Sequence, residues 1–399
     1  MRAFAELVRA GDPFRVVDDP AIPGAPPSGQ PRLTRVLVPL GPVGMFSASN
    51  FPFAFSVLGG DTASALAAGC PVVVKAHPGH WRLSDAVFEV ASRAIAREGF
   101  PVGILQMVQG ASREVGLQLL RHPDIQAVAF TGSFRGGAAL QAEANARPRP
   151  IPFYGELGSI NPVVALPGAV AQQGPDLAKS LAASIGQSTG QFCTSPGVLV
   201  LLDDDEADAF VQQLAGSLQQ QAMHRMLTPQ MRQLYEDGVA RLSSHPAARR
   251  LIPAREGGPG PVPNLVEADF DAFLSSHELR EEVFGPSCVV VKVPSLNRVP
   301  DVLRAVGGSL TVTLWGADAE DEDTRQLVRV AMQIAGRVLF AGVPTGVAIA
   351  RAQHHGGPWP ASTRPETTSV GLAAIDRFLR PVALQDAPGW LIDRKGIPC

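Results

Sequence analysis

The chain has 399 residues, of which 45% are hydrophobic and 18% charged, and its formal net charge is −3. This balance is typical of a soluble globular protein with two or more domains, and it excludes wholesale disorder. The lysines and arginines are scattered along the chain, so no basic field attracts nucleic acid or an acidic membrane, and we expect neither as a partner.

Four cysteines lie far apart in the sequence, at Cys70, Cys193, Cys288 and Cys399. They form no CxxC pair and no metal-ligand spacing, so the sequence predicts no metal site and no disulfide framework, which suits a reducing compartment. The N-terminus has no apolar signal-peptide core, and no apolar run reaches the length of about 18 residues that a membrane span needs. A cytoplasmic protein is expected.

The first third of the chain predicts a parallel sheet. Residues 1–9 form an expected amphipathic helix, and the proline-rich stretch 12–31 is a linker or an edge hairpin with a strand near 33–38. Further strands are expected at 43–46, 71–75, 104–108 and 127–130. Helices are expected at 61–69, at 84–98 with Ser84 as N-cap, and at 113–120. Strands alternating with helices indicate βαβ units.

The second half repeats this alternation. Helices are expected near 176–188, 206–219 and 322–334. Strands are expected near 198–202, 311–314 and 337–340. The tail is irregular after Pro358 and becomes apolar at 378–382. The fold class is therefore predicted to be α/β.

Cys193 is the most informative residue. It lies in Gly-Gln-Phe-Cys-Thr-Ser-Pro (190–196), where glycine and polar residues predict a turn. A thiol presented on a turn is a candidate nucleophile, although free cysteines are commonly just small buried hydrophobes. Because a free thiol has a pKa of about 8.5, it is mostly protonated at neutral pH and needs a base or a positive field.

Glu156 and Asn50 are the candidate partners of this thiol. Glu156, bracketed by Gly155 and Gly158, could serve as a partly desolvated base, or it could be a helix N-terminal carboxylate that faces solvent. Asn50 stands among phenylalanine and proline residues that would hold its amide rigidly as an oxyanion donor. The alternative for Asn50 is a turn asparagine that bonds its own backbone.

Two further segments are candidates for ligand binding. Lys75 ends the strand expected at 71–75, and the carboxyl end of a parallel strand faces the crevice where α/β proteins bind ligands. The alternative is a surface lysine. Gly132 and Ser133 place backbone amides and a hydroxyl at a helix N-terminus, which suits a phosphate, or they form an ordinary strand-to-helix turn.

Six strings, in this order, resemble the aldehyde dehydrogenase superfamily. They are Ser-Ala-Ser-Asn-Phe-Pro (47–52), Val-Val-Lys (73–75), Phe-Thr-Gly-Ser (130–133), Glu-Leu-Gly-Ser-Ile-Asn-Pro (156–162), Gly-Gln-Phe-Cys-Thr (190–194) and Glu-Glu-Val-Phe-Gly-Pro (281–286). Within the superfamily, residues 59–71, 75–78 and 343–347 look most like the α-ketoglutaric semialdehyde (2,5-dioxovalerate) dehydrogenases. The resemblance runs from about Leu33 to the tail.

The resemblance implies a fold with a Rossmann-type cofactor domain, an α/β catalytic domain and a small oligomerisation hairpin. The cofactor domain is expected at 1–157 with the hairpin at about 15–38, the catalytic domain at 158–366, and an oligomerisation tail at 367–399. A homodimer or homotetramer is implied. Only forty-nine residues precede Asn50, which is fewer than the family usually has.

The resemblance also implies catalytic roles. Cys193 matches the nucleophile that forms a thiohemiacetal and then a thioester. Asn50 and the backbone N–H of Cys193 match the oxyanion donors, and Glu156 matches the base that activates the hydrolytic water.

Cofactor contacts follow in the same way. Lys75 matches an adenosine-ribose contact, and Gly132 and Ser133 match the pyrophosphate region. Glu282 matches the residue that holds the nicotinamide ribose, and Phe284 the aromatic beside that ring.

NADP is the expected cofactor, with NAD as the alternative. Many NAD-preferring members carry a glutamate three residues after the lysine, where this chain has Pro78. Without that carboxylate nothing there repels a 2′-phosphate, and Lys75, with His77 or His80, can attract it.

The predicted function is NADP-dependent oxidation of a small-molecule aldehyde, 2,5-dioxopentanoate, to the carboxylate. The alternatives are a dehydrogenase for fatty or other aldehydes, a weakly active or inactive remnant, and a cysteine acyltransferase or thioesterase. Glu282 and Phe284 argue against the last of these, since a thioesterase has no use for a ribose clamp.

Overall fold

The computed structural model describes residues 1–11, 15–254 and 258–392, which form two compact units. Unit 1 combines Met1–Gly155, Ile349–Gln353 and the chain from Thr367 onward. Unit 2 combines Glu156–Ala348 and His354–Glu366. The roles expected for these parts, cofactor binding and catalysis, stay predictions.

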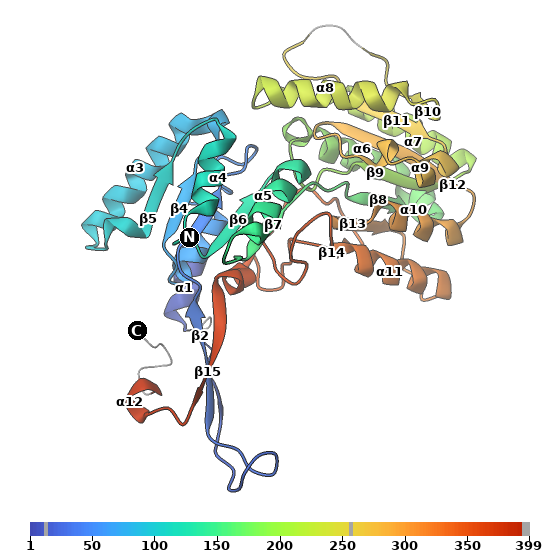
Figure 1. The fold of residues 1–399 in the computed structure, drawn as a ribbon. Coiled ribbons are helices and arrows are strands. Elements are labelled where there is room, and N and C mark those ends of the chain that lie inside the picture. The colour runs from blue at the N-terminus through green and yellow to red at the C-terminus, as the bar shows by residue number, and fades with distance from the viewer. Residues whose placement is uncertain (12–14, 255–257, 393–399) are drawn as a thin grey trace. The chain divides into compact units, whose positions relative to one another are not determined.

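Unit 1 is built on a five-stranded sheet with the strand order β5-β4-β3-β6-β7. Its strands are β3 (Val43–Phe46), β4 (Val72–Lys75), β5 (Leu105–Val108), β6 (Ala127–Thr131) and β7 (Phe153–Glu156). The helices between and before them, several of which flank the sheet in Figure 1, are α1 (Arg2–Arg9), α2 (Gly60–Ala67), α3 (Trp81–Arg97), α4 (Arg113–Arg121) and α5 (Phe134–Ala146). β3 pairs in parallel with both β4 and β6, as the alternation of strands and helices predicts.

The start of α3 differs from its prediction. The helix begins at Trp81 and not at Ser84, because the 3₁₀ turn Pro78–His80 runs directly into it. Ser84 is therefore buried within the helix, where its Oγ lies 3.1 Å from Nδ1 of His80. Ser84 is not an N-cap.

The proline-rich stretch leads into an antiparallel sheet. β1 (Val17–Asp19) pairs with β2 (Leu33–Pro39), which confirms the edge hairpin, although residues 12–14 lie outside the described chain. The opposite edge of β2 pairs with β15 (Leu379–Gln385), so the C-terminal part of the chain returns to unit 1 (Figure 1). The short helix α12 (Gly389–Ile392) follows β15.

A buried ion pair fixes this returning segment. Arg377 lies in the 3₁₀ helix Leu372–Phe378, and its guanidinium donates to the Asp61 carboxylate of α2 at 2.7 Å. The side chains are only 3% and 4% exposed, respectively. Breaking a buried pair leaves an uncompensated charge, so each partner depends on the other.

Unit 2 contains a seven-stranded sheet with the order β10-β11-β12-β9-β8-β13-β14. Its strands are β8 (Pro162–Ala165), β9 (Val198–Leu202), β10 (Ala248–Arg250), β11 (Asn264–Ala268), β12 (Ser287–Val293), β13 (Ser309–Trp315) and β14 (Ala335–Leu339). Its helices are α6 (Pro167–Gly186), α7 (Asp205–Gln219), α8 (Pro229–Ser244), α9 (Phe270–Ser275), α10 (Val299–Val306) and α11 (Glu322–Ile334). All the pairings are parallel except β10 with β11.

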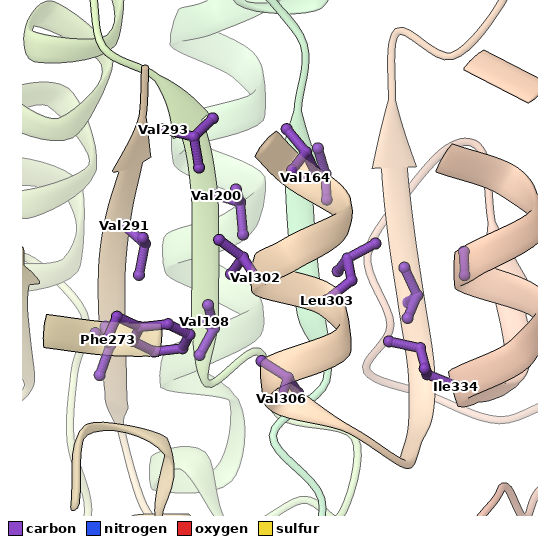
Figure 2. Packing of buried hydrophobic residues seen from close by; sticks show 14 of the residues in the cluster. Val164, Val198, Val200, Phe273, Val291, Val293, Val302, Leu303, Val306 and Ile334 are labelled. Atoms are coloured by element: carbon purple, nitrogen blue, oxygen red, sulfur yellow. The ribbon is translucent and has the colours of Figure 1, made fainter. Parts of the chain in front are cut away.

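Apolar layers cover both faces of this sheet. Figure 2 shows Val302, Leu303 and Val306 of α10 packed against valines of β8, β9 and β12. A second cluster, on α6 and α7, includes Leu181 and Phe210. Strands covered on both faces are continuous apolar runs, which explains the valine-rich sequences of β9 and β12.

Helix α6 is longer than predicted. It begins at Pro167, nine residues before the expected start at 176, and it continues through Pro175. The apolar face formed by Val170, Ala178 and Leu181 extends across that proline and packs on the sheet. Tertiary packing therefore offsets the hydrogen bond that Pro175 cannot donate.

In the described part of the chain, no helix is long and apolar enough to cross a membrane.

Candidate active site

The backbone before Cys193 turns sharply. After α6, Ser188, Thr189 and Gly190 have φ values of 47°, 58° and 66°. A Cβ on Gly190 would lie 2.1 Å from the carbonyl carbon of Gly285, so only glycine permits this approach. Two of the motif strings, 190–194 and 281–286, thereby meet backbone to backbone within unit 2.

The side chain of Asn161 holds the turn that contains Cys193 through hydrogen bonds. Its Nδ2 donates to the backbone carbonyls of Cys193 at 2.8 Å and Ser195 at 3.0 Å. Its Oδ1 accepts from the Ser159 hydroxyl at 2.8 Å, and from the backbone N–H and the hydroxyl of Thr311 at 3.2 Å each. Asn161 is fully buried with a φ of 51°, a conformation that asparagine tolerates better than most residues.

Cys193, His355 and Glu156 form one cluster. The Cys193 Sγ lies 3.5 Å from Nε2 of His355, and the same nitrogen lies 3.1 Å from Oε1 of Glu156. The His355 and Glu156 side chains are 1% and 3% exposed, whereas Cys193 is only partly buried. Glu156 ends β7 and is buried, so it is not the solvent-facing helix residue of the alternative interpretation.

The thiol of Cys193 is held in its protonated form. Burial, reinforced by the negative charges of Glu156 and Glu282, raises the pKa of Cys193 well above its ordinary value. A nucleophilic thiolate therefore requires a proton acceptor at the moment of attack. His355 and Glu156 are both placed to take that proton.

Glu282 and Phe284 line a cavity of unit 2 together with Ser159, Gly190 and Phe192. Burial raises the pKa of Glu282 to about 7, in spite of a hydrogen bond with the backbone of Ser159. The carboxyl is thus near half-protonation at neutral pH. It lies close enough to Cys193 for its charge to raise the pKa of that thiol.

The remaining predicted residues belong to unit 1. Lys75 is the last residue of β4, at the carboxyl end of a parallel strand, and burial lowers its pKa. Ser133 is the N-cap of α5, where its Oγ accepts from the N–H of Gly136 at 3.3 Å. A Cβ on Gly132 would lie 2.7 Å from the Phe130 ring, so local packing itself requires a glycine at this position. Asn50 lies in a bend after β3 and is partly exposed.

His77, which follows Lys75 closely in the sequence, supplies less charge than expected. Burial, with smaller contributions from His80 and Lys75, lowers the pKa of His77 to about 4, so His77 is neutral at pH 7. Its ring stacks on His80 with centroids 5.4 Å apart, and Nε2 of His80 lies 2.9 Å from the carbonyl of Ala48. His77 therefore does not supply a positive charge for a phosphate at neutral pH.

Two site residues escaped the sequence analysis. Asn161 lies inside one of the quoted strings, but nothing in its spacing indicates a contact with Cys193. His355 is separated from Cys193 by 162 positions and precedes Gly-Gly-Pro, a turn signal that carries no chemistry. Only the fold brings these residues to the sulfur.

Comparison with known proteins decides the family. The sequence profile of the aldehyde dehydrogenase family matches residues 9–233. The chain belongs to the aldehyde dehydrogenase family. It is 44% identical to α-ketoglutaric semialdehyde dehydrogenase 2 of Azospirillum brasilense, over 98% of this chain and 75% of that protein. It is 39% identical to the α-ketoglutaric semialdehyde dehydrogenase of Acinetobacter baylyi, with the same coverage.

The fold agrees with this assignment. The structure of apo betaine aldehyde dehydrogenase from Staphylococcus aureus superposes with a TM-score of 0.79 at 20% identity, covering 97% of this chain and 74% of that one. The α/β fold of the aldehyde dehydrogenases and the oxidoreductase class are therefore established for this chain.

Aldehyde dehydrogenases use NAD⁺ or NADP⁺, and the residues present fit such a cofactor. Unit 1 offers the Lys75 ammonium at a strand end and the amide-bearing N-terminus of α5, both of which suit ribose and phosphate groups. Unit 2 offers the Glu282 carboxyl as an acceptor for ribose hydroxyls, with the Phe284 ring in the same cavity.

Proposed function

We propose that this aldehyde dehydrogenase oxidises 2,5-dioxopentanoate, the α-ketoglutaric semialdehyde, to the dicarboxylate with NADP⁺. The observation that carries the proposal is the cluster of Cys193, His355 and Glu156, in which a thiol, an imidazole and a carboxylate are in mutual contact. The substrate is suggested by the relatives from Azospirillum brasilense and Acinetobacter baylyi.

Proton transfer from Cys193 opens the reaction. His355 Nε2, at 3.5 Å, accepts the thiol proton, and the Glu156 carboxylate stabilises the resulting imidazolium. The thiolate then attacks the aldehyde carbon to form a thiohemiacetal. The backbone N–H of Cys193 and, by resemblance, the Asn50 amide stabilise the oxyanion.

A bound nicotinamide supplies the hydride acceptor for this class of oxidation. Lys75, Gly132 and Ser133 would hold the adenosine and phosphate portion, and Glu282 and Phe284 the nicotinamide riboside. The acyl group remains on Cys193 as a thioester until water releases the acid. After the His355 imidazolium has released its proton to solvent, Glu156 removes a proton from that water, and the C–S bond of the thioester breaks to return Cys193 as a thiolate.

An acidic substrate is supported by Arg337 of β14. Its Nη1 and Nη2 donate to the carbonyls of Gly346 and Pro344, at 3.2 and 2.6 Å, but its Nε is buried without a hydrogen-bond partner among the described residues. Burial lowers the pKa of Arg337, and the guanidinium lies close enough to Cys193 for the charge of a thiolate there to oppose that shift. A buried N–H that lacks an acceptor is satisfied if the distal carboxylate of a semialdehyde acid binds there.

A preference for NADP is supported by Lys75 and Pro78. The Lys75 cation attracts a 2′-phosphate, and Pro78 has no carboxylate to repel it or to bind a ribose hydroxyl in its place.

Homo-oligomer formation through the hairpin is also proposed. Within residues 1–11, 15–254 and 258–392, no strand pairs with the outer edge of β1, which carries the exposed Val17, with the exposed Ile22 just beyond it. Exposed strand edges pair readily with other chains. Light scattering after size exclusion should find a dimer or tetramer, and a monomer at all concentrations would refute this.

The function is tested by incubating the purified chain with NADP⁺ and a panel of aldehydes while NADPH absorbance is followed. The panel contains 2,5-dioxopentanoate, succinic semialdehyde, pentanal and a long-chain aldehyde. We expect the highest kcat/KM for 2,5-dioxopentanoate and no activity in Cys193→Ser. A chain that binds NADP⁺ but oxidises no aldehyde would refute the proposal.

A further inference from the structure

The cluster of Glu156, Cys193 and His355 has the geometry of a metal site as well as of a catalytic one. The three candidate ligand atoms all lie within 4.8 Å of one another. Bond lengths to zinc of about 2.0–2.3 Å place neighbouring ligands of a tetrahedral site roughly 3.3–3.7 Å apart. The distance from Sγ to Nε2, 3.5 Å, falls in this range, and the distance from Nε2 to Oε1, 3.1 Å, is slightly shorter.

The kinds of donor select the ion. A thiolate and an imidazole favour zinc and related soft cations, whereas magnesium and calcium prefer oxygen ligands alone. Three protein ligands leave one position of a tetrahedron open for water, which is the ligand count of many zinc enzymes. A thiolate and a carboxylate together also balance the two positive charges of the ion.

Burial fixes the ligands and leaves one side open. His355 and Glu156, at 1% and 3% side-chain exposure, are held by packing, so little side-chain entropy is lost when they bind an ion. Cys193 is the one ligand that is partly exposed, so an ion can enter past its sulfur. Asn161 holds the backbone of Cys193 through a hydrogen bond to its carbonyl.

We propose that Glu156, Cys193 and His355 form a reversible binding site for Zn²⁺, and that the bound ion blocks aldehyde oxidation by masking the sulfur. On binding, the S–H bond of Cys193 breaks, its proton passes to water, and an S–Zn bond forms. His355 ligates through the lone pair of Nε2 with its proton on Nδ1. No electron is transferred. Only the inhibitory effect rests on the proposed function, because ion binding does not depend on it.

Binding is measured on the full chain after dialysis against EDTA and then against metal-free buffer. Titration calorimetry with Zn²⁺ should give one site per chain. Co²⁺ in place of Zn²⁺ should produce a thiolate-to-cobalt charge-transfer band. Cys193→Ser should abolish that band, and His355→Asn should raise the Zn²⁺ dissociation constant by at least about tenfold.

His354→Asn is the matched control, because it removes the neighbouring imidazole but none of the three ligands. It should bind both ions like the wild type, and circular dichroism melts establish that each variant is folded. A wild type without a one-to-one site, or a site that Cys193→Ser and His355→Asn leave unchanged, would overturn the proposal.

The inhibitory effect has a separate readout. Zn²⁺ should protect Cys193 from alkylation by iodoacetamide and should stop NADPH formation, and EDTA should reverse both effects. A chain that binds Co²⁺ through its thiolate but oxidises no aldehyde would support the metal site and refute the proposed function. A chain that oxidises the semialdehyde but forms no cobalt–thiolate band would do the opposite.

Discussion

The side-chain amide of Asn161 donates to the backbone carbonyl of Cys193 at 2.8 Å and so sets the position of the sulfur. Because the oxygen of the same amide accepts from Thr311 on β13, the cysteine turn is connected to a strand that is paired on both sides within the unit 2 sheet. Although Cys193 lies on a turn, these hydrogen bonds tie its backbone to a strand of the unit 2 sheet. Rigid support of this kind is what a nucleophile needs to stay in attacking geometry.

Replacing Asn161 should weaken both the fold and the reactivity of the thiol. Asn161→Ala leaves several buried polar groups without partners, so the free energy of unfolding should fall by about 2–4 kcal/mol. Asn161→Gly loses the same side-chain hydrogen bonds, but glycine adopts the positive φ of this position without strain. The glycine variant should therefore be more stable than the alanine variant by about 1 kcal/mol. Urea unfolding measures both, and alkylation of Cys193 measures reactivity. Wild-type stability in Asn161→Ala would contradict the supporting role.

Replacing Arg337 should discriminate between acidic and neutral substrates. Arg337→Met removes the buried Nε–H donor, and a charge-assisted hydrogen bond is worth about 1.5–3 kcal/mol. KM for 2,5-dioxopentanoate should rise about 10- to 100-fold, while KM for pentanal, which lacks a carboxylate, should change little. Steady-state kinetics with both aldehydes supply the comparison. An equal rise for both would mean that Arg337 only supports the 344–346 loop.

Replacing Lys75 should reduce the preference for NADP. Lys75→Met removes the cation at the end of β4, so the dissociation constant for NADP⁺ should rise about tenfold more than that for NAD⁺. His77→Asn is the control. Because burial lowers the pKa of His77 to about 4, its ring is uncharged at pH 7 and its loss should leave the ratio unchanged. Fluorescence titration of both cofactors tests this, and a ratio unaffected by Lys75→Met would contradict it.

Cofactor binding should tighten as pH rises through neutrality. Burial raises the pKa of Glu282 to about 7, so the carboxylate that accepts ribose hydroxyls is the minor form at pH 6 and the major form at pH 8. A hydrogen bond to the ionised carboxylate contributes about 1 kcal/mol more binding free energy than one to the protonated carboxyl, which corresponds to about fivefold in affinity. Titration with NAD⁺, which lacks a titrating 2′-phosphate, isolates this effect. Glu282→Gln should bind with the same affinity at both pH values; if its affinity still rises, another group is responsible.

Breaking the Asp61–Arg377 pair should unfold unit 1 more readily. Arg377→Met leaves the Asp61 carboxylate buried without its partner and should cost about 3–5 kcal/mol. The double variant Asp61→Asn with Arg377→Met should recover much of this loss. Arg93→Ala, which breaks an exposed pair with Glu89, is the control and should have little effect. A double variant no more stable than the single one would contradict the pairing argument.

Much of the fold could be predicted because local signals agree with it. The strands expected at 71–75, 127–130 and 198–202 are β4, β6 and β9, and the helix expected at 322–334 is α11. The errors occur where tertiary structure overrides local signals. Ser84 has the chemistry of an N-cap, but the 3₁₀ turn before it starts the helix three residues earlier.

The candidate site divides in the same way. Cys193 and Glu156 could be selected as candidates from their residue types and glycine-rich contexts, but those contexts left the alternatives open, and the family resemblance was needed to favour the catalytic roles. His355 could not, since its role comes only from packing against residues 162 and 199 positions away. The shifted pKa values are likewise properties of burial, which no single string of residues reports.

Because the chain returns to unit 1 after unit 2, the last parts of unit 1 are synthesised after all of unit 2. Unit 2 ends at Glu366, so every residue it needs has been synthesised before Arg377 and β15 are made. About 340 residues separate the end of β2 from the start of β15, which at about 5–20 residues per second is a delay of roughly 20–70 s. During that interval β2 presents an open edge, and Asp61 has no cation beside it. All the residues of the candidate active-site unit are thus synthesised before unit 1 receives its last strand.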